Sequence, residues 1–274
     1  MPEYELAVDE EASAVSMPLA AAYAFLRERL EADDASTAAG EVERVLARYP
    51  NDLNAHLLAG EALYGLGQAD RARPHFERAV LADPEEPAAH VGLGVLAEED
   101  GDSALAISEY LAASRLRPSL EGVREQIAAA SGERPEYLDA VHLMRLHLAS
   151  GDGIAALAEW QGVEDTIRSE SWARLGLLHA LWLAGRADEA EKLAHELLDS
   201  APGSLKPALF ISFIEARRGN QDAALAALAE LRDEDPSGHW TANHAHSAPP
   251  TWRGPEWSAT VEIVAPVEPV MLLK

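Results

Sequence analysis

A period of 34 residues constrains this chain more than any other feature of its sequence. Residues 53–86 and 87–120 align without a gap. In both segments His, Gly, Gly, Ala, an aromatic residue, Ala and Pro recur at positions 4, 8, 15, 20, 24, 27 and 32. A fixed period of this length indicates stacked, similar units, since a single unit cannot bury its apolar face alone.

Small residues at positions 8, 20 and 27, an aromatic residue at 24 and proline at 32 resemble the tetratricopeptide repeat. The resemblance implies that each unit is a pair of antiparallel helices. The physical reasons are visible in the residues. Gly67 and Gly101 at position 15 accept the left-handed backbone that ends a first helix. Pro84 and Pro118 at position 32 end a second helix, because proline has no N–H and its ring cannot fit inside one.

The same register extends toward the N-terminus. It defines an earlier unit at residues 19–52, with Ala38 at position 20 and Pro50 at position 32. Position 15 of this unit is Asp33 instead of Gly, so we expect its turn to be looser. Terminal repeats are often atypical. Residues 1–18 precede this unit as a short acidic arm.

After Pro118 the phase breaks, and residues 121–136 fit no repeat position. Apolar residues at helical spacing predict one short inserted helix there: Val123, Ile127 and Ala130. The period then resumes in three further units, 137–170, 171–204 and 205–238. The unit 137–170 is the least regular, since Arg168 stands where the others carry proline. Alanine occupies position 20 in all six units.

These units predict an all-α, right-handed superhelical solenoid of antiparallel helix pairs over residues 19–238, followed by an irregular tail. Ala and Leu dominate the composition and β-branched residues are sparse, which favours helix. Residues 239–274 are rich in proline, so we expect no long helix and no capping helix there. Residues 260–265 are expected to form one short extended segment.

The net charge of the chain argues against two classes of partner. The chain has 22 Lys and Arg against 47 Asp and Glu, a net charge of −25. So acidic a surface is expected to repel nucleic acid and anionic membranes, and solubility is the simpler account of it. The absence of Cys excludes disulfides, thiolate metal sites and Cys nucleophiles.

No targeting or membrane segment is expected. Residues 1–18 carry five acids and no base, unlike a basic leader peptide. No apolar run approaches the roughly 18 residues that a membrane helix needs. We therefore expect a cytoplasmic location.

The resemblance also implies where a partner binds. The first helix of each repeat lines a concave face, with positions 2, 5, 9 and 12 pointing inward. In the N-terminal repeats these positions hold Tyr23, Arg27, Asn54, Leu57, Glu61, Tyr64, Val91, Val95 and Glu98. In the C-terminal repeats they hold the candidate partner-binding groove: Leu138, Val141, Arg145, Leu148, Trp172, Leu175, His179, Trp182, Lys206, Leu209 and Phe213.

The C-terminal group is apolar and aromatic, and Arg145, His179 and Lys206 are its only charged or titratable members. Aromatic and Arg residues are the usual anchors of interfaces. The group is therefore a candidate site for an apolar peptide with an acidic or carboxylate feature. Trp172 and Trp182 are equally explained as packing residues between neighbouring repeats. The Lys, Arg and Asn clamp of relatives that bind chaperone tails is absent from positions 5 and 9.

The tail has three possible roles. Its apolar residues between 261 and 273 are expected to fold back onto the last repeats or to lie in the groove as an internal ligand. A disordered linker is the alternative, although the apolar content argues against full disorder. His239, His244 and His246 have the chemistry of metal ligands. Solvated loop histidines are the simpler interpretation, and we expect no metal site.

The chain carries no phosphate loop, no HExxH and no nucleophile elbow, so neither catalysis nor a cofactor is expected. The leading hypothesis is a non-catalytic protein-interaction scaffold or adaptor. It would bind a protein or peptide partner in the concave groove. Two alternatives remain, a self-associating module that forms a homo-oligomer and a regulatory subunit of an enzyme complex. In both, the tail is an intramolecular groove ligand.

Overall fold

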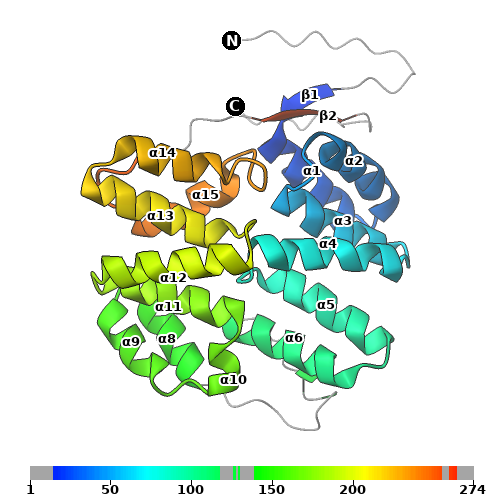
Figure 1. Ribbon diagram of the computed structural model, residues 1–274. Helices are drawn as coiled ribbons and strands as arrows, with labels where there is room; N and C mark the ends of the chain where they lie inside the picture. Colours follow the sequence, from blue (N-terminus) through cyan, green and yellow to red (C-terminus); the bar gives the residue numbers. More distant parts are fainter. Residues whose placement is uncertain (1–14, 118–125, 128, 130–138, 255–258, 264–274) are drawn as a thin grey trace.

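The computed structural model describes residues 15–117, 126, 127, 129, 139–254 and 259–263. Within these ranges, successive helices pack as antiparallel pairs that follow one another along the chain (Figure 1). The pairs are α1 (Leu19–Glu31) with α2 (Ala35–Arg48), α3 (Leu53–Gly65) with α4 (Ala69–Ala82), α5 (Pro87–Glu99) with α6 (Ser103–Leu116), α8 (Ala140–Ala149) with α9 (Gly153–Trp160), α11 (Ser171–Leu183) with α12 (Ala187–Ser200), and α13 (Leu205–Arg218) with α14 (Gln221–Ala229). The predicted all-α solenoid is confirmed.

Aspartate side chains begin several of these helices. Each accepts a hydrogen bond from the backbone N–H three residues further on, which satisfies one of the donors that a helix N-terminus leaves unpaired. The aspartates are Asp34, Asp52, Asp102, Asp139 and Asp152. The sequence therefore specifies the start of a helix locally, through one side chain.

The turn inside each pair is equally local in origin. The glycines at position 15 have φ between 70° and 86°: Gly67, Gly101, Gly151, Gly185 and Gly219. Asp33 occupies the equivalent place in the first pair with φ 61°. The expected looser turn is wrong, because the short polar side chain of aspartate tolerates the left-handed region.

In the second and third pairs, glycine at position 8 lets the two helices of the pair approach each other. A Cβ added to Gly60 would lie 2.7 Å from the Phe76 ring, and one added to Gly94 would lie 2.5 Å from the Tyr110 ring. Both rings come from position 24 of the same unit and are buried. The recurring Gly and aromatic residues are thus two sides of one contact between paired helices.

The middle of the chain is less regular. Helix α9 has eight residues, and the short helix α10 (Asp165–Arg168) follows it before α11 begins. Within the predicted insert, residues 126, 127 and 129 are helical. Ile127 is buried against Ala106 and Tyr110. Val123 and Ala130 lie outside the described residues.

The two halves of the solenoid lie side by side (Figure 1). One hydrophobic cluster crosses between them, with Leu57 and Ala82 from the N-terminal half and Leu197 and Phe210 from the C-terminal half. The backbone N–H of Leu53 donates to the carbonyl of Glu234 at 2.9 Å. The repeats therefore do not form an open arc, since repeat two touches the end of repeat six.

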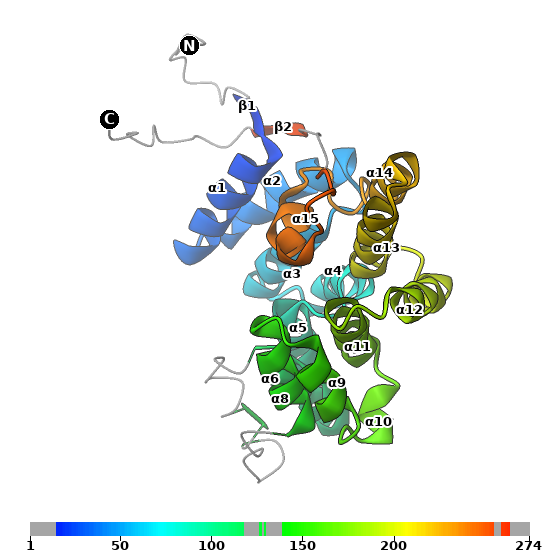
Figure 2. The same cartoon turned by 90° about the vertical axis from the view of Figure 1, so that its left-hand side faces the viewer.

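A short helix follows Pro236, which corrects the expectation of none. This helix, α15 (His239–His244), leads into the 3-10 helix η1 (Ala245–Ser247). The carboxylate of Asp235 accepts hydrogen bonds from the N–H groups of Trp240 and Thr241 at 3.2 and 2.8 Å. That carboxylate takes the place of a helix cap. Figure 2 shows α15 between α3 and α13.

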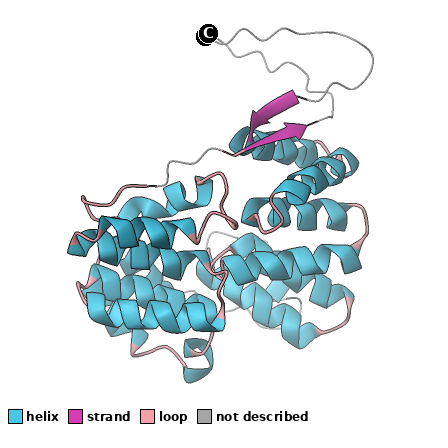
Figure 3. Ribbon diagram, turned by 45° about the horizontal axis from the view of Figure 1, so that its top comes forward, coloured by secondary structure: helices cyan, strands magenta, loops and turns pink. Residues whose placement is uncertain are grey.

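Two strands join the ends of the described chain. Strand β1 (Val15–Pro18) pairs antiparallel with β2 (Thr260–Ile263), Ser16 facing Glu262 (Figure 3). The short extended segment predicted at 260–265 is thus present. Val261 was expected on the last repeats or in the groove, but it packs on the first repeat, beside Leu19 and Val42. Residues 264–273 lie outside the described residues.

No helix in the described part of the chain combines the length and the apolar character that crossing a bilayer requires.

Candidate interaction surface on the concave face

Helices α8, α11 and α13 carry the residues predicted to line the C-terminal groove. Leu138 lies outside the described residues. Arg145 and Lys206 are partly buried. The remaining predicted members are buried: Val141, Leu148, Trp172, Leu175, His179, Trp182, Leu209 and Phe213. The surface expected to be open is therefore covered by other parts of the chain.

The two tryptophans of α11 have different surroundings. Trp172 packs with Leu116 and Val141, between α6 and α8, as a packing residue between neighbouring repeats would. Trp182 packs with Phe210 and Phe213 of α13, its ring centroid 6.0 Å from that of Phe213. Of the two, Trp182 is the one that contacts the described part of the tail.

The tail docks on α11 through Ser247. The indole N–H of Trp182 donates to the carbonyl oxygen of Ser247 at 2.9 Å. The hydroxyl of Ser247 lies 2.8 Å from Nε2 of His179. The neighbouring His246 ring packs edge-on against His179, with centroids 5.6 Å apart. One tail residue therefore contacts two side chains of the predicted groove.

A second set of contacts holds the tail on α13. The indole N–H of Trp252 donates to the hydroxyl of Ser212 at 2.7 Å. Its ring meets Phe213 at 5.1 Å and 89°, the edge-to-face geometry that aromatic pairs prefer. The hydroxyl of Thr251 donates to the carbonyl of Ala216 at 2.8 Å. Residues 245–252, which we call the tail ligand, therefore cover part of the C-terminal groove.

The cationic members of the predicted groove are occupied as well. Arg145 binds Glu85, at the turn between α4 and α5, at 2.8 Å, and Lys206 binds the same carboxylate. Burial opposes ionisation of Glu85, but the attraction of Lys206 and then Arg145 exceeds this effect and lowers its pKa to about 2. The acidic feature expected of a partner is thus supplied by the chain itself.

His179 stays neutral beneath the tail. Burial lowers its pKa to about 3, and the positive charge of Lys206 acts in the same direction. A neutral imidazole has one N–H and one lone pair, so Nε2 can either donate to Ser247 or accept from it. His179 therefore adds no charge to the docking surface at neutral pH.

The N-terminal half of the concave face contains a cavity of about 650 Å³. It is lined by predicted N-terminal groove residues together with parts of the tail, among them Arg27, Asn54, Leu57, Glu61, Glu86, Trp240 and His244. Burial raises the pKa of Glu61 against the opposing charge of Arg27. Burial also raises the pKa of Glu86, against the hydrogen bond from the Ala88 N–H. A cationic group entering this cavity would favour the ionised form of Glu61 and Glu86.

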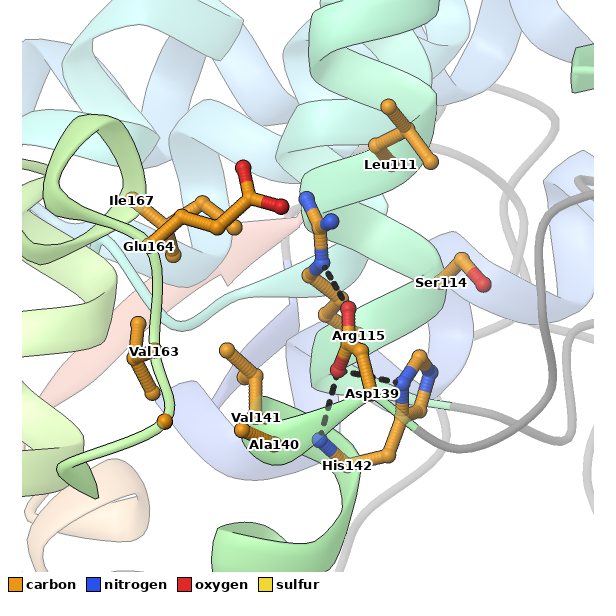
Figure 4. A pocket seen from close by; sticks show the side chains of 11 residues that line it. Leu111, Ser114, Arg115, Asp139, Ala140, Val141, His142, Val163, Glu164 and Ile167 are labelled. Carbon is orange, nitrogen blue, oxygen red and sulfur yellow. Dashed lines mark hydrogen bonds and ion pairs between the residues drawn. The ribbon is translucent and has the colours of Figure 1, made fainter. Parts of the chain in front are cut away.

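A smaller pocket of about 300 Å³ lies where α6 meets α8 (Figure 4). Asp139 accepts from Nε of Arg115 at 2.8 Å, from Nδ1 of His142 at 2.8 Å and from the His142 N–H at 3.0 Å. Burial works against ionisation, but these hydrogen bonds hold the pKa of Asp139 well below its usual range. Asp139 is also the cap of α8, and this structural role accounts for the cluster.

The tail histidines considered as metal ligands are held separately. His244 stacks on Trp240 at 4.1 Å and its Nδ1 lies 2.8 Å from the Trp240 carbonyl. His239 lies 3.1 Å from the Asn243 amide, and His246 packs on His179. In the described ranges, no three His, Asp or Glu side chains are arranged to hold a metal ion.

Sequence reasoning missed four contributors to this surface: Glu85, Ser212, Ser247 and Trp252. Ser212 carried a usable signal, because it places a hydroxyl at position 8 of its unit, where the other units carry glycine, leucine or methionine. Glu85 stands one residue after the helix-ending Pro84, where an acid is unremarkable. Its role depends on Arg145 and Lys206, which the 34-residue register does not place beside it.

Comparison with known proteins supports the repeat assignment. The tetratricopeptide-repeat family model matches residues 57–121. A TPR repeat-containing protein from Pseudomonas aeruginosa is 31% identical over 127 residues. That stretch covers 46% of this chain and 45% of the relative, so the match spans about half the length of the curated relative.

Several solved structures resemble the chain at low similarity. A tetratricopeptide repeat protein from Parabacteroides merdae is 15% identical with a TM-score of 0.34, and the match covers 80% of this chain and 82% of that one. YrrB, described as a TPR protein with an unusual peptide-binding site, is 17% identical with a TM-score of 0.32, covering 76% and 98%.

The family match and the repeat register agree in position, because residues 57–121 span the two most regular units. The fold and the family match support a protein–protein interaction module. The repeat region of the chain is therefore similar to the tetratricopeptide-repeat family, with no specific subfamily indicated.

Proposed function

We propose that this protein is a non-catalytic adaptor that docks a partner segment in its C-terminal groove, and that the tail ligand fills this groove until the partner displaces it. The observation that carries the proposal is the pair of hydrogen bonds that Ser247 makes with His179 and Trp182. Side chains that sequence alone assigns to partner binding are thereby used to hold a peptide segment.

Burial differs between the tail ligand and the segment before it. Trp240 is 5% exposed and donates to the carboxylate of Asp83 at 2.8 Å, so α15 is built into the core. Ser247 and Trp252 are only partly buried, while His246 and Pro250 are exposed. Segments with few buried contacts open at low free-energy cost. Release of residues 245–252 therefore leaves α15 in place.

Peptide recognition by this surface follows ordinary interface physics. Trp182, Phe210 and Phe213, with a few hydrogen-bonding groups, give this surface a compact set of anchors. A micromolar complex needs only about 8 kcal/mol. A tail held on the same chain competes at an effective concentration in the millimolar range. A partner therefore binds more weakly to the closed form than to the open one.

The test uses a fluorescently labelled peptide with the sequence of residues 243–254 and measures its binding by anisotropy. Its receptors are the full wild-type chain, the Trp252→Ala chain and the Arg253→Ala chain. Arg253 is exposed and is the matched control. We expect Trp252→Ala to bind the peptide about tenfold more tightly than the other two, because its groove is more often open.

Two further variants keep the test decisive. Trp182→Phe in the Trp252→Ala chain removes the N–H that meets Ser247, and peptide binding is expected to weaken. Thr251→Ala with Gln221→Ala removes two hydrogen bonds between the tail and the repeats. This double variant replaces Trp252→Ala if that chain loses helicity by circular dichroism. Equal affinity for every chain, or no binding to any folded chain, would overturn the proposal.

A further inference from the structure

We infer that the C-terminal groove recognises one class of partner segment: a neutral, proline-containing turn with a serine or threonine followed five residues later by tryptophan. This rests on the proposed function, that the groove is a docking site. The tail ligand displays the chemistry that the groove accepts, and each of its contacts assigns one requirement.

The first requirement is a hydroxyl residue. The carbonyl of Ser247 accepts from Trp182, a contact that any residue can make because it uses the backbone. The hydroxyl of Ser247 lies 2.8 Å from Nε2 of His179, a contact that the side chain makes and the backbone cannot. The first contact fixes the register of the segment, and the second reads its sequence.

The second requirement is tryptophan. The indole N–H of Trp252 reaches the Ser212 hydroxyl at 2.7 Å while the ring stands edge-to-face on Phe213. Phenylalanine would keep the ring contact and lose the hydrogen bond. A site built to bond an N–H rejects an analogue that lacks it more strongly than it rejects a change of apolar size.

The third requirement is the turn that joins them. The N–H of Trp252 donates to the carbonyl of Pro249 at 2.9 Å, which closes a turn over residues 249–252. Pro250 stands second in this turn, where proline is favoured because its φ is already set. A segment fixed in this way loses less conformational entropy on binding.

Charge sets the fourth requirement. Residues 245–252 contain no Asp, Glu, Lys or Arg. Arg145 and Lys206 are both bound to Glu85, and the guanidinium of Arg217 lies over the Trp182 ring, 5.5 Å from its centroid. A basic segment would meet Lys206 and Arg217. The groove therefore disfavours a basic segment, and the segment that occupies it is neutral.

The test is a double-mutant cycle by anisotropy. The receptors are the full Trp252→Ala chain with Ser212 retained and the same chain with Ser212→Ala. The probes are the residue 243–254 peptide and its Trp252→Phe version. With Ser212 present, we expect the Phe peptide to bind about tenfold more weakly. With Ser212→Ala, the two peptides are expected to bind within about twofold of each other.

A matched pair of probes tests the hydroxyl. The Ser247→Thr peptide is expected to bind nearly as well as the parent, and the Ser247→Ala peptide several-fold more weakly. Equal binding of all peptides would overturn this inference while leaving the proposed function standing. No binding of any peptide would remove the proposed function itself. Wild-type dimers that the peptide dissociates, seen by sedimentation, would make a second copy the occupant and overturn the partner assignment.

Discussion

The carboxylate of Glu85, at the turn between α4 and α5, binds the ammonium group of Lys206 at the start of α13, 121 residues further along the chain. Arg145 of α8 binds the other oxygen of the same carboxylate. The exposed fraction of the Glu85 side chain is 6%. One buried acid thus joins repeat two to repeats four and six and brings the two halves together.

Glu85→Gln should destabilise the fold strongly. The substitution leaves Arg145 and Lys206 beside each other without a countercharge in a largely buried site. Removing one partner of a buried ion pair typically costs about 3 kcal/mol or more. Urea unfolding measures the change in the free energy of unfolding. Glu77→Gln on the exposed face of α4 is the control, with an expected change within about 0.5 kcal/mol. A comparable small loss for both variants would contradict the closing role of Glu85.

The effect of Glu85 should depend on pH in a defined direction. Its folded pKa of about 2 lies below the ordinary value of 4.5. Its stabilisation is therefore full above the ordinary value and is lost as pH falls toward 2. We expect the difference in unfolding free energy between wild type and Glu85→Gln to be constant from pH 7 to 5 and to shrink below pH 4.5. A difference that grows on acidification would be inconsistent with a buried ionised Glu85.

His179 should make the stability of the protein depend on pH. Its folded pKa of about 3 lies below the ordinary 6.5, so the unfolded chain takes up its proton first as pH falls. Stability from this group is present above pH 6.5 and is lost below it, at up to about 1.4 kcal/mol per pH unit. His179→Gln removes this slope, and the exposed His195→Gln on α12 retains it. Thermal unfolding between pH 7 and 4 measures it, and parallel profiles for both variants would refute the prediction.

Close helix packing predicts an asymmetry between two glycines. Gly94→Ala places a Cβ 2.5 Å from the Tyr110 ring, and overpacking of this kind costs about 1–3 kcal/mol. Gly40→Ala in α2 meets nothing within 4 Å, so the gain in helix propensity should stabilise the protein by about 0.5–1 kcal/mol. Chemical denaturation of both variants is sufficient. Stabilisation by Gly94→Ala would show that the α5–α6 contact is looser than described.

Local features of the fold could be predicted because each depends on a few adjacent residues. Gly67 needs only its own left-handed backbone to end α3, and Asp52 needs only the N–H groups of α3 to begin it. Gly94 and Tyr110 recur with the period and so predict close helix packing. The prediction of a looser turn at Asp33 was wrong, because aspartate can adopt the backbone conformation that the pattern assigns to glycine.

The contact between the two halves of the solenoid and the covering of the C-terminal groove by residues 245–252 could not be predicted. Contacts such as Glu85 with Lys206 or Ser247 with Trp182 join distant residues, and no sequence period relates them. The sequence did predict that part of the tail packs on the repeats. It favoured the apolar residues from Val261 onward, since apolar content was the only available signal. The hydrogen-bonding groups of Ser247 and Trp252 hold the tail in the groove instead.

The central claim is that residues 245–252 occupy the groove and can be displaced from it. The chain has no Cys, so spin labels can be placed at Arg253→Cys and Lys192→Cys, both exposed. The distance distribution between them is measured by electron paramagnetic resonance in the full chain, alone and with excess residue 243–254 peptide. The account predicts one narrow distance for the chain alone and a second, longer population that grows with peptide. A single distance that does not change at a peptide concentration that saturates the Trp252→Ala chain would contradict it.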